Sequence, residues 1–306
     1  MRRERAVWAR QSYLRFTDQV IQYPKHWAVD LSVIHSFRAN STRRISVLYH
    51  SKRPQTNGDD VSCCCPTRSA SSPGGIGRAT ARLFAQHGAR TVILDLDEAQ
   101  ARAAAADLGE AHLGLACDVT DKAACLKAVG QVVAELGRVD VLINNAGISQ
   151  PLKIMDIEPK NYDAVLDVNL RGTLYMSQAA IPQMRQAKQG SIVCMSSVSA
   201  QRGGGIFGGP HYSAAKGGVL GLGKAMAREL GPDNIRVNSV TPGLIQTDIT
   251  AGKLTDELKV EIAKGIPLNR LGVADDIANA CLFLSSDLSS YITGAVIDVN
   301  GGMLIH

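Results

Sequence analysis

A tyrosine and a lysine four residues apart carry the clearest chemistry in this sequence. Tyr212 and Lys216 stand in the segment Tyr-Ser-Ala-Ala-Lys, and helical spacing would place both side chains on one face. A free tyrosine has a pKa of about 10 and is a poor base at neutral pH. A lysine ammonium one turn away favours the phenolate, which can then exchange a proton with an alcohol oxygen. Alone, such a pair is also common on helix surfaces.

Polar residues also follow two apolar segments that are typical of buried strands. Ser197 comes just after residues 191–195, where a hydroxyl can hydrogen-bond a substrate carbonyl or simply cap the next turn. The segment 144–147, Asn-Asn-Ala-Gly, follows residues 139–143. Asparagine before glycine usually marks a turn, but at the end of a parallel strand it can instead satisfy open backbone groups beside a cofactor.

Two further features suit a dinucleotide. Gly75-Ile76-Gly77 opens a predicted helix, where glycine lets the backbone approach a pyrophosphate and the helix N-terminus stabilises its charge. Asp95 ends the next predicted strand about 20 residues later, where a carboxylate can accept the ribose hydroxyls of NAD and repel a 2′-phosphate. The alternatives are an ordinary turn for the glycines and a helix N-cap for Asp95 or Asp97.

The elements that must position these residues alternate along the chain. Helices are expected over 77–87, 98–107, 122–136, 162–186 (broken near Gly172 and Pro182) and 211–230, and strands over 91–94, 113–117, 139–143, 191–195, 235–240 and 295–299. Short apolar strands that alternate with helices predict a doubly wound α/β fold, a parallel sheet covered by helices on both faces. Ligands of such folds bind at the carboxyl ends of the strands.

The composition divides the 306 residues into two parts. Residues 1–70 carry a net charge of +7, both tryptophans and one of the 29 glycines, whereas residues 71–306 carry −2. We therefore expect 1–70 to be an atypical basic segment outside the native domain and 71–306 to form a single domain. No apolar run suggests a membrane span or a secretory signal. The seven cysteines lack spaced pairs, which argues against a zinc site or disulfide scaffold and for the cytoplasm.

Taken in order, these motifs resemble the short-chain dehydrogenase/reductase family over about residues 72–306. The resemblance also draws on Asn169, on Pro242-Gly243 with Thr247, and on the segments 292–294 and 298–302. It implies a Rossmann-type fold and a catalytic tetrad of Asn169, Ser197, Tyr212 and Lys216. It further implies cofactor contacts from Gly75, Ile76, Gly77, Asp95, Asp118, Val119, Asn145, Ala146, Gly147, Tyr212, Lys216, Pro242, Gly243, Ile245 and Thr247.

The implied reaction is hydride transfer between a nicotinamide cofactor and a secondary alcohol or ketone. In this reading Tyr212 is the acid/base, and Lys216 lowers its pKa and holds the nicotinamide ribose. Ser197 positions the carbonyl oxygen, and Asn169 holds a water in the proton relay. The cofactor supplies the hydride and the protein supplies placement and electrostatics. No metal is expected.

The start of the domain departs from the family. Its Thr-Gly-x-x-x-Gly-x-Gly motif directly follows an apolar strand, but here Ala70 and Ser71 take the first two positions and residues 65–69 include proline and arginine. Residues 61–65 lie about five positions too early to replace that strand. Residues 45–49 read as the best strand of the segment, yet they lie more than 20 positions too early.

Three explanations stay open: a frameshift or wrong gene start ahead of an intact domain, a genuine basic extension such as a transit peptide, or a variant that has lost its first strand. If the first explanation holds, deletion of residues 1–55 should change the protein little. A nucleic-acid tail fits poorly, because the cations are scattered. The functional alternative to an oxidoreductase is a catalytically silent scaffold that cannot hold cofactor.

The resemblance extends to 3-oxoacyl-carrier-protein reductases and to sugar or polyol dehydrogenases. Carrier-protein reductases usually use NADP, so Asp95 favours NAD and the second group. Phe207 and His211 are candidates to face the substrate, and 246–266 should form a lid. A face of small residues on the helix 211–230 (Ala214, Ala215, Gly218, Gly221), together with the family's habits, predicts a homotetramer. No nucleic-acid or membrane partner is expected.

Overall fold

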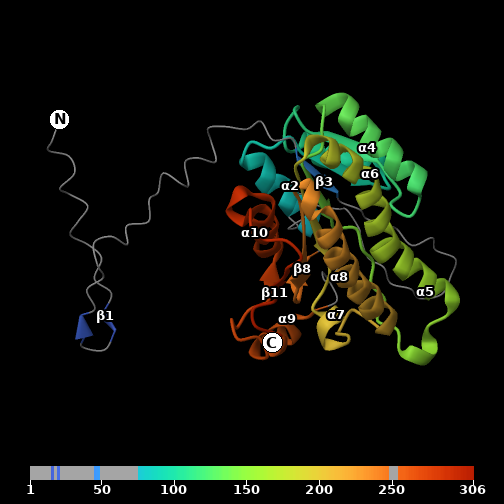
Figure 1. The fold of residues 1–306 in the computed structure, drawn as a ribbon. Helices are drawn as coiled ribbons and strands as arrows, with labels where there is room; N and C mark the ends of the chain where they lie inside the picture. The colour runs from blue at the N-terminus through green and yellow to red at the C-terminus, as the bar shows by residue number, and fades with distance from the viewer. Residues whose placement is uncertain (1–14, 17–18, 21–44, 49–74, 248–253) are drawn as a thin grey trace. The chain divides into compact units, whose positions relative to one another are not determined.

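The computed structural model describes residues 15–16, 19–20, 45–48, 75–247 and 254–306. By its contacts the chain divides into Met1–Ser41 and Thr42–His306. The first unit contains a short antiparallel pair, β1 (Arg15–Phe16) with β2 (Gln19–Val20). The second unit contains all the other described elements (Figure 1).

Parallel strands form the centre of the second unit. They run in the order β11-β8-β7-β6-β3, and β4 pairs separately with β5. Residues of β3 and β4 also come within 8 Å of one another, which places β4 and β5 beyond β3. The strands are β3 (Ile45–Leu48), β4 (Val92–Asp95), β5 (Leu113–Ala116), β6 (Val141–Asn144), β7 (Gly190–Met195), β8 (Ile235–Pro242) and β11 (Val296–Val299).

Helices cover both faces of this sheet (Figure 1). One apolar core joins the strands to α4 (Lys122–Leu136), α6 (Gly172–Ala187) and α8 (Pro210–Leu230). The opposite core joins them to α2 (Ile76–Gln86), α3 (Glu98–Ala106) and α10 (Ala274–Ser285). The predicted doubly wound fold is confirmed. Its strands are apolar because helices bury both of their faces, as in β7, which is buried at every residue.

The local signals explain most element ends. Asp121 caps α4 by accepting a hydrogen bond from the backbone N–H of Ala123, and Gly137 ends that helix in the left-handed region at φ 85°. Asp97, rather than Asp95, caps α3. The expected break at Pro182 is wrong, because α6 continues through it while packed on α4, β6 and β7. The irregularity lies at Asp167–Arg171, a π-helical turn between α5 (Pro159–Leu166) and α6.

The first strand position is filled from an unexpected place. β3 pairs in parallel register with β6, Ile45 opposite Val141 and Leu48 opposite Asn144. The sequence analysis favoured this segment as a strand but placed it too far upstream for the position. Apolar, β-branched composition is what a buried central strand needs, and 45–48 is the segment upstream of α2 that supplies it. Pro66, Arg68, Ala70 and Ser71 lie outside the described residues.

Candidate active site

Tyr212 and Ser197 meet at the carboxyl end of β7. Tyr212 lies in the first turn of α8, and Ser197 follows β7 and accepts a 3.1 Å hydrogen bond from the backbone N–H of Ser199. Burial raises the pKa of Tyr212, and a hydrogen bond with the Ser197 hydroxyl partly opposes that rise. The raised pKa is the reverse of the direction that the spacing of Tyr212 and Lys216 predicts, because desolvation outweighs the stabilisation of the phenolate in this state.

Lys216 lies one turn further along α8 and is buried, with 3% of its surface exposed. Its Nζ donates a 2.8 Å hydrogen bond to the Met195 carbonyl and lies 5.9 Å from the centre of the Tyr212 ring. Burial lowers the pKa of Lys216 to about 8. Ser196 Oγ donates a 2.8 Å bond to the Lys216 carbonyl, which ties α8 to the end of β7. The pair therefore shares a face and a desolvated environment.

Asn169 sits in the π-helical turn and is fully buried. Its Nδ2 donates to the carbonyls of Ile148 and Val165, each at 2.8 Å. Its Oδ1 is buried and has no hydrogen-bond partner among the residues that the structure describes. Single π-helical turns often occur at functional sites, and a buried polar atom without a partner suggests an unseen water or ligand.

Gly147 connects these groups. A Cβ on Gly147 would lie 2.8 Å from Asn169 Oδ1 and 3.3 Å from Lys216 Nζ. Both polar atoms therefore face one small space above this backbone, and any larger residue would fill it. Lys216 Nζ can donate and Asn169 Oδ1 can accept, so the space suits a bridging water or a ligand hydroxyl. The structure thus brings Ser197, Tyr212, Lys216 and Asn169 together.

The residues expected to hold the cofactor lie along the same edge of the sheet. Gly75 precedes α2, whose first turn contains no acidic residue, so its open N–H groups suit an anion. Asp95 is buried at the end of β4, where its Oδ1 accepts a 3.0 Å bond from the Asp97 backbone. Asp118 accepts bonds from the backbone and hydroxyl of Thr120 and so shapes its own turn.

The remaining members of that set follow β5, β6 and β8. Asn144, the first asparagine of its motif, is structural, because its buried Nδ2 donates to Ser177 Oγ at 3.0 Å. The other members lie at or just beyond strand ends: Val119 is buried, Asn145, Ala146 and Gly147 are half-buried, Pro242 and Ile245 are buried, and Gly243 and Thr247 are half-buried. The narrow Gly147 space and the unpartnered Asn169 Oδ1 both fit a bound nicotinamide ribose or its water.

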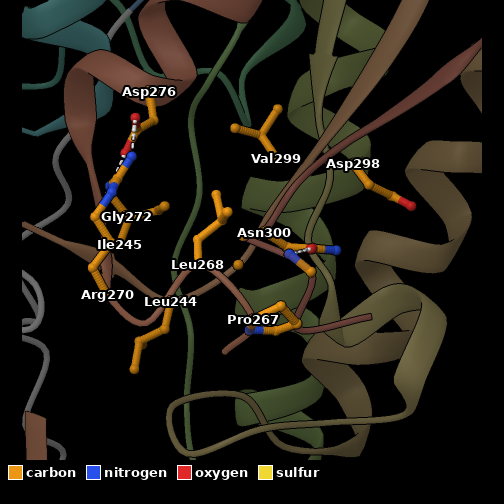
Figure 2. Close-up of a pocket in the computed structure, with 13 residues that line it drawn as sticks. Leu244, Ile245, Pro267, Leu268, Arg270, Gly272, Asp276, Asp298, Val299 and Asn300 are labelled. Carbon is orange, nitrogen blue, oxygen red and sulfur yellow. Dashed lines mark hydrogen bonds and ion pairs between the residues drawn. The ribbon is translucent and has the colours of Figure 1, made fainter. Parts of the chain in front are cut away.

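A pocket of about 440 Å³ includes Gly243 and Ile245, two of the predicted cofactor contacts, in its lining (Figure 2). The bidentate pair of Arg270 with Asp276 closes one side. None of the four predicted catalytic residues lines it. The candidate catalytic site is therefore the group of hydrogen-bonded residues around Tyr212, and not this pocket.

Comparisons with known proteins show to which family the chain belongs. The family model described as enoyl-(acyl carrier protein) reductase matches residues 70–304. A short-chain type dehydrogenase/reductase of Sinorhizobium fredii is 64% identical over 241 residues, 78% of this chain and 95% of that protein. The chain belongs to the short-chain dehydrogenase/reductase family.

Two further relatives extend this result. The 3-oxoacyl-[acyl-carrier-protein] reductase FabG of Chlamydia muridarum is 42% identical over 233 residues, 75% of this chain and 93% of that protein. The crystal structure of gox2181 superposes with a TM-score of 0.75 at 31% identity and covers 88% of this chain and 98% of that one. This short-chain dehydrogenase/reductase is thus an NAD(P)-dependent oxidoreductase that acts on CH–OH or carbonyl groups. The comparisons give no support to the catalytically silent alternative.

The surroundings of the site contain residues whose partners the sequence did not reveal. His211 is 2% exposed and paired with Gln150, so it does not lie open to solvent as a substrate-facing residue would. Phe207 packs on Leu254, Ile266 and Leu271, which belong to the described part of the predicted lid and its flank. Within the described ranges, no helix is long and apolar enough to span a membrane, and no cluster of acidic, histidine or cysteine residues suits a metal ion.

Proposed function

We propose that this enzyme transfers a hydride between NAD(H) and a secondary alcohol or ketone, with Tyr212 as the acid/base. The observation that carries the proposal is the convergence of four side chains. Tyr212 is hydrogen-bonded to Ser197, and Lys216 Nζ and Asn169 Oδ1 face one space above Gly147. This arrangement provides a proton donor and a cation one turn apart on α8, and an oxygen-positioning hydroxyl just after β7.

Each side chain has a role that follows from its position. Ser197 donates to or accepts from the substrate oxygen, and the Tyr212 hydroxyl gives that oxygen a proton during reduction or takes one during oxidation. Lys216 holds positive charge beside the ring, and Asn169 Oδ1 accepts from a water that Lys216 also reaches. The nicotinamide supplies or receives the hydride when bound. The two α8 residues and Gly147 would hold its ribose.

Substitution of Tyr212 by phenylalanine tests the proposal. Tyr212→Phe keeps the ring and removes the proton donor, so turnover should fall by about a thousand-fold while NADH binding survives. Steady-state kinetics and NADH fluorescence titration measure the two effects. Near-normal turnover of Tyr212→Phe would refute the role of this residue.

The cofactor preference rests on Asp95. This carboxylate is 1% exposed at the end of β4, where a 2′-phosphate would meet a like charge. We therefore propose NAD(H) over NADP(H), although the resemblance to carrier-protein reductases argues the other way. Steady-state kinetics with both cofactors decide the question.

The substrate belongs to the same proposal. The named function of the Chlamydia relative makes 3-oxoacyl thioesters the first compounds to test, and the Asp95 argument makes polyols the second. The lid helix α9 (Asp256–Lys264) is mostly charged and exposed outside its buried flanks, so it gives no preference for a long acyl chain. Rates with both classes, compared at equal cofactor saturation, distinguish them.

We also propose a cytoplasmic homotetramer. Of the small residues on α8, Ala215 is buried and Gly218 packs on Leu170, whose Cδ2 lies 2.8 Å from the position of a Cβ. Ala214 and Gly221 are exposed and leave a face that a second copy can approach closely. The described cysteines are free and buried, which suits a reducing compartment. Light scattering that reports only monomer at micromolar concentration would overturn the assembly.

A further inference from the structure

His211, immediately before Tyr212, is an unusual residue for its environment. It is 2% exposed, and its Nε2 lies 3.0 Å from Gln150 Oε1. Because an amide oxygen can only accept, Nε2 carries the hydrogen and Nδ1 is left as an acceptor. That Nδ1 is buried and finds no hydrogen-bond partner in the described part of the chain. A buried acceptor without a partner costs stability, so packing alone does not explain a histidine where an apolar residue would fit.

The partner of His211 belongs to the segment that follows Gly147. Gln150 contacts the start of α8 twice, because its backbone carbonyl also accepts a 2.8 Å bond from the Gly209 N–H. The fit is tight, since a Cβ on Gly209 would lie 2.4 Å from the Leu152 carbonyl and 3.0 Å from that of Gln150. Two hydrogen bonds and a close backbone contact thus fix the first turn of α8 to this segment.

The same segment is held from its other side by Asn169. Asn169 Nδ2 donates to the Ile148 carbonyl, two residues before Gln150. A continuous path of contacts therefore runs from Asn169 through 148–150 to His211 and the backbone of Tyr212. Asn169 and Tyr212, two members of the predicted tetrad, are thus connected through residues 148–150 and His211.

We propose that His211 and Gln150 form a positioning pair that sets the Tyr212 hydroxyl against Ser197. The inference rests on the proposed acid/base role of Tyr212. Loss of the side-chain pair removes one of the two hydrogen bonds that hold the first turn of α8, and small displacements of a reacting group are costly in rate. Cofactor contacts from Lys216 stay in place, because that residue is anchored separately to Met195 and Ser196.

The test compares kcat with KM in matched variants of the full chain. His211→Leu and Gln150→Leu should each lower kcat about ten-fold or more, with the KM for NADH unchanged within about two-fold. The double variant should be little worse than either single one, since both remove the same contact. His211→Gln, whose amide can donate to Gln150 Oε1 from a similar reach, should recover most of the turnover.

His112→Leu is the control. His112 is a partly buried histidine that bonds to Thr91 before β4 and β5, at the edge of the sheet opposite the site. It should leave kcat within about two-fold of the wild type. Tyr212→Phe, measured alongside, separates the two hypotheses, because activity in that variant refutes the acid/base proposal itself.

The positioning role is overturned if Tyr212→Phe is inactive while Gln150→Leu keeps near-normal kcat. It is equally overturned if His211→Gln is as impaired as His211→Leu, since a purely steric role would give that result. Gln150→Leu keeps the histidine in place, so it decides the matter even if His211→Leu does not fold. Circular dichroism spectra establish folding in each case.

Discussion

At the carboxyl edge of the sheet, the catalytic region around β7 and α8 differs from the cofactor region around β3 and α2. Around β7 and α8, the hydrogen bonds that hold Lys216 and Asn169 come from buried residues. Around β3 and α2, the strand is Ile45–Leu48 and the helix begins at Ile76, so 27 residues of sequence separate the two elements. The difference teaches that catalytic geometry and phosphate binding are separable here. We expect the first to be intact and the second to limit cofactor affinity.

Among the variants that test this comparison, the largest effect is expected at Gly147, close to Asn169 and Lys216. Gly147→Ala places a methyl group 2.8 Å from Asn169 Oδ1 and 3.3 Å from Lys216 Nζ, in the space that the proposal assigns to water or ribose. Turnover should fall by about a hundred-fold. Gly130→Ala is the control, because a Cβ there meets nothing within 4 Å and alanine favours the helix. Equal activity of both variants would contradict the role proposed for the space above Gly147.

The region around β3 predicts that two N-terminal deletions differ in melting temperature. We propose that residues 1–70 contribute to the domain only through β3, so deletion of 1–41 should leave the melting temperature nearly unchanged. Deletion of 1–55 removes β3 and should lower it by about 10 °C or more, because a central strand position is emptied. This revises the expectation from sequence that the longer deletion is harmless. Equal melting temperatures for the two deletions would show that β3 adds no stability.

Asp95 tests the cofactor preference with a smaller effect. Asp95→Ser removes the charge and should improve kcat/KM with NADP(H) relative to NAD(H) by about ten-fold to a hundred-fold. Asp97→Ser is the control, because Asp97 caps α3 and serine caps equally well. If Asp95→Ser leaves the ratio of the kcat/KM values for the two cofactors unchanged, this carboxylate does not select between them.

The smallest effect concerns the pH dependence of stability. Burial lowers the pKa of Lys216 in the folded chain to about 8 from 10.5. Between pH 8 and pH 10.5 the lysine is therefore protonated in the unfolded chain but mostly neutral in the folded chain. The resulting penalty is full below pH 8 and is relieved as pH rises toward 10.5. Without cofactor, the free energy of unfolding of Lys216→Met minus that of the wild type should therefore be roughly 2 kcal/mol larger at pH 7 than at pH 10. Urea unfolding at both pH values measures this, and a constant difference would contradict it.

Local patterns were enough to predict most of the fold. The apolar strands and the extent of the helix 122–136 were readable because each depends on neighbours in sequence. The helix α10 and the continuation of α6 through Pro182 were not anticipated, since packing against other elements decides them. The position of β3 was missed for a related reason. Pairing with β6 depends on composition and space rather than on distance along the chain.

The site shows the same division. The order of motifs along the chain was enough to nominate Ser197, Tyr212, Lys216 and Asn169, which the structure brings together. The pairing of His211 with Gln150 spans 61 residues and leaves no local pattern. The direction of the Tyr212 pKa was also beyond the sequence, because burial had to be weighed against charge.

The central comparison is tested most directly by restoring the first strand. Residues 1–71 are replaced by a short apolar strand that ends in Thr-Gly, and NADH titration is combined with turnover at saturating cofactor. The account predicts that NADH binds about ten-fold or more tightly, roughly 1.4 kcal/mol, while kcat stays within about two-fold of the full chain. If kcat rises as much as affinity does, the catalytic side is not independently intact and the comparison fails.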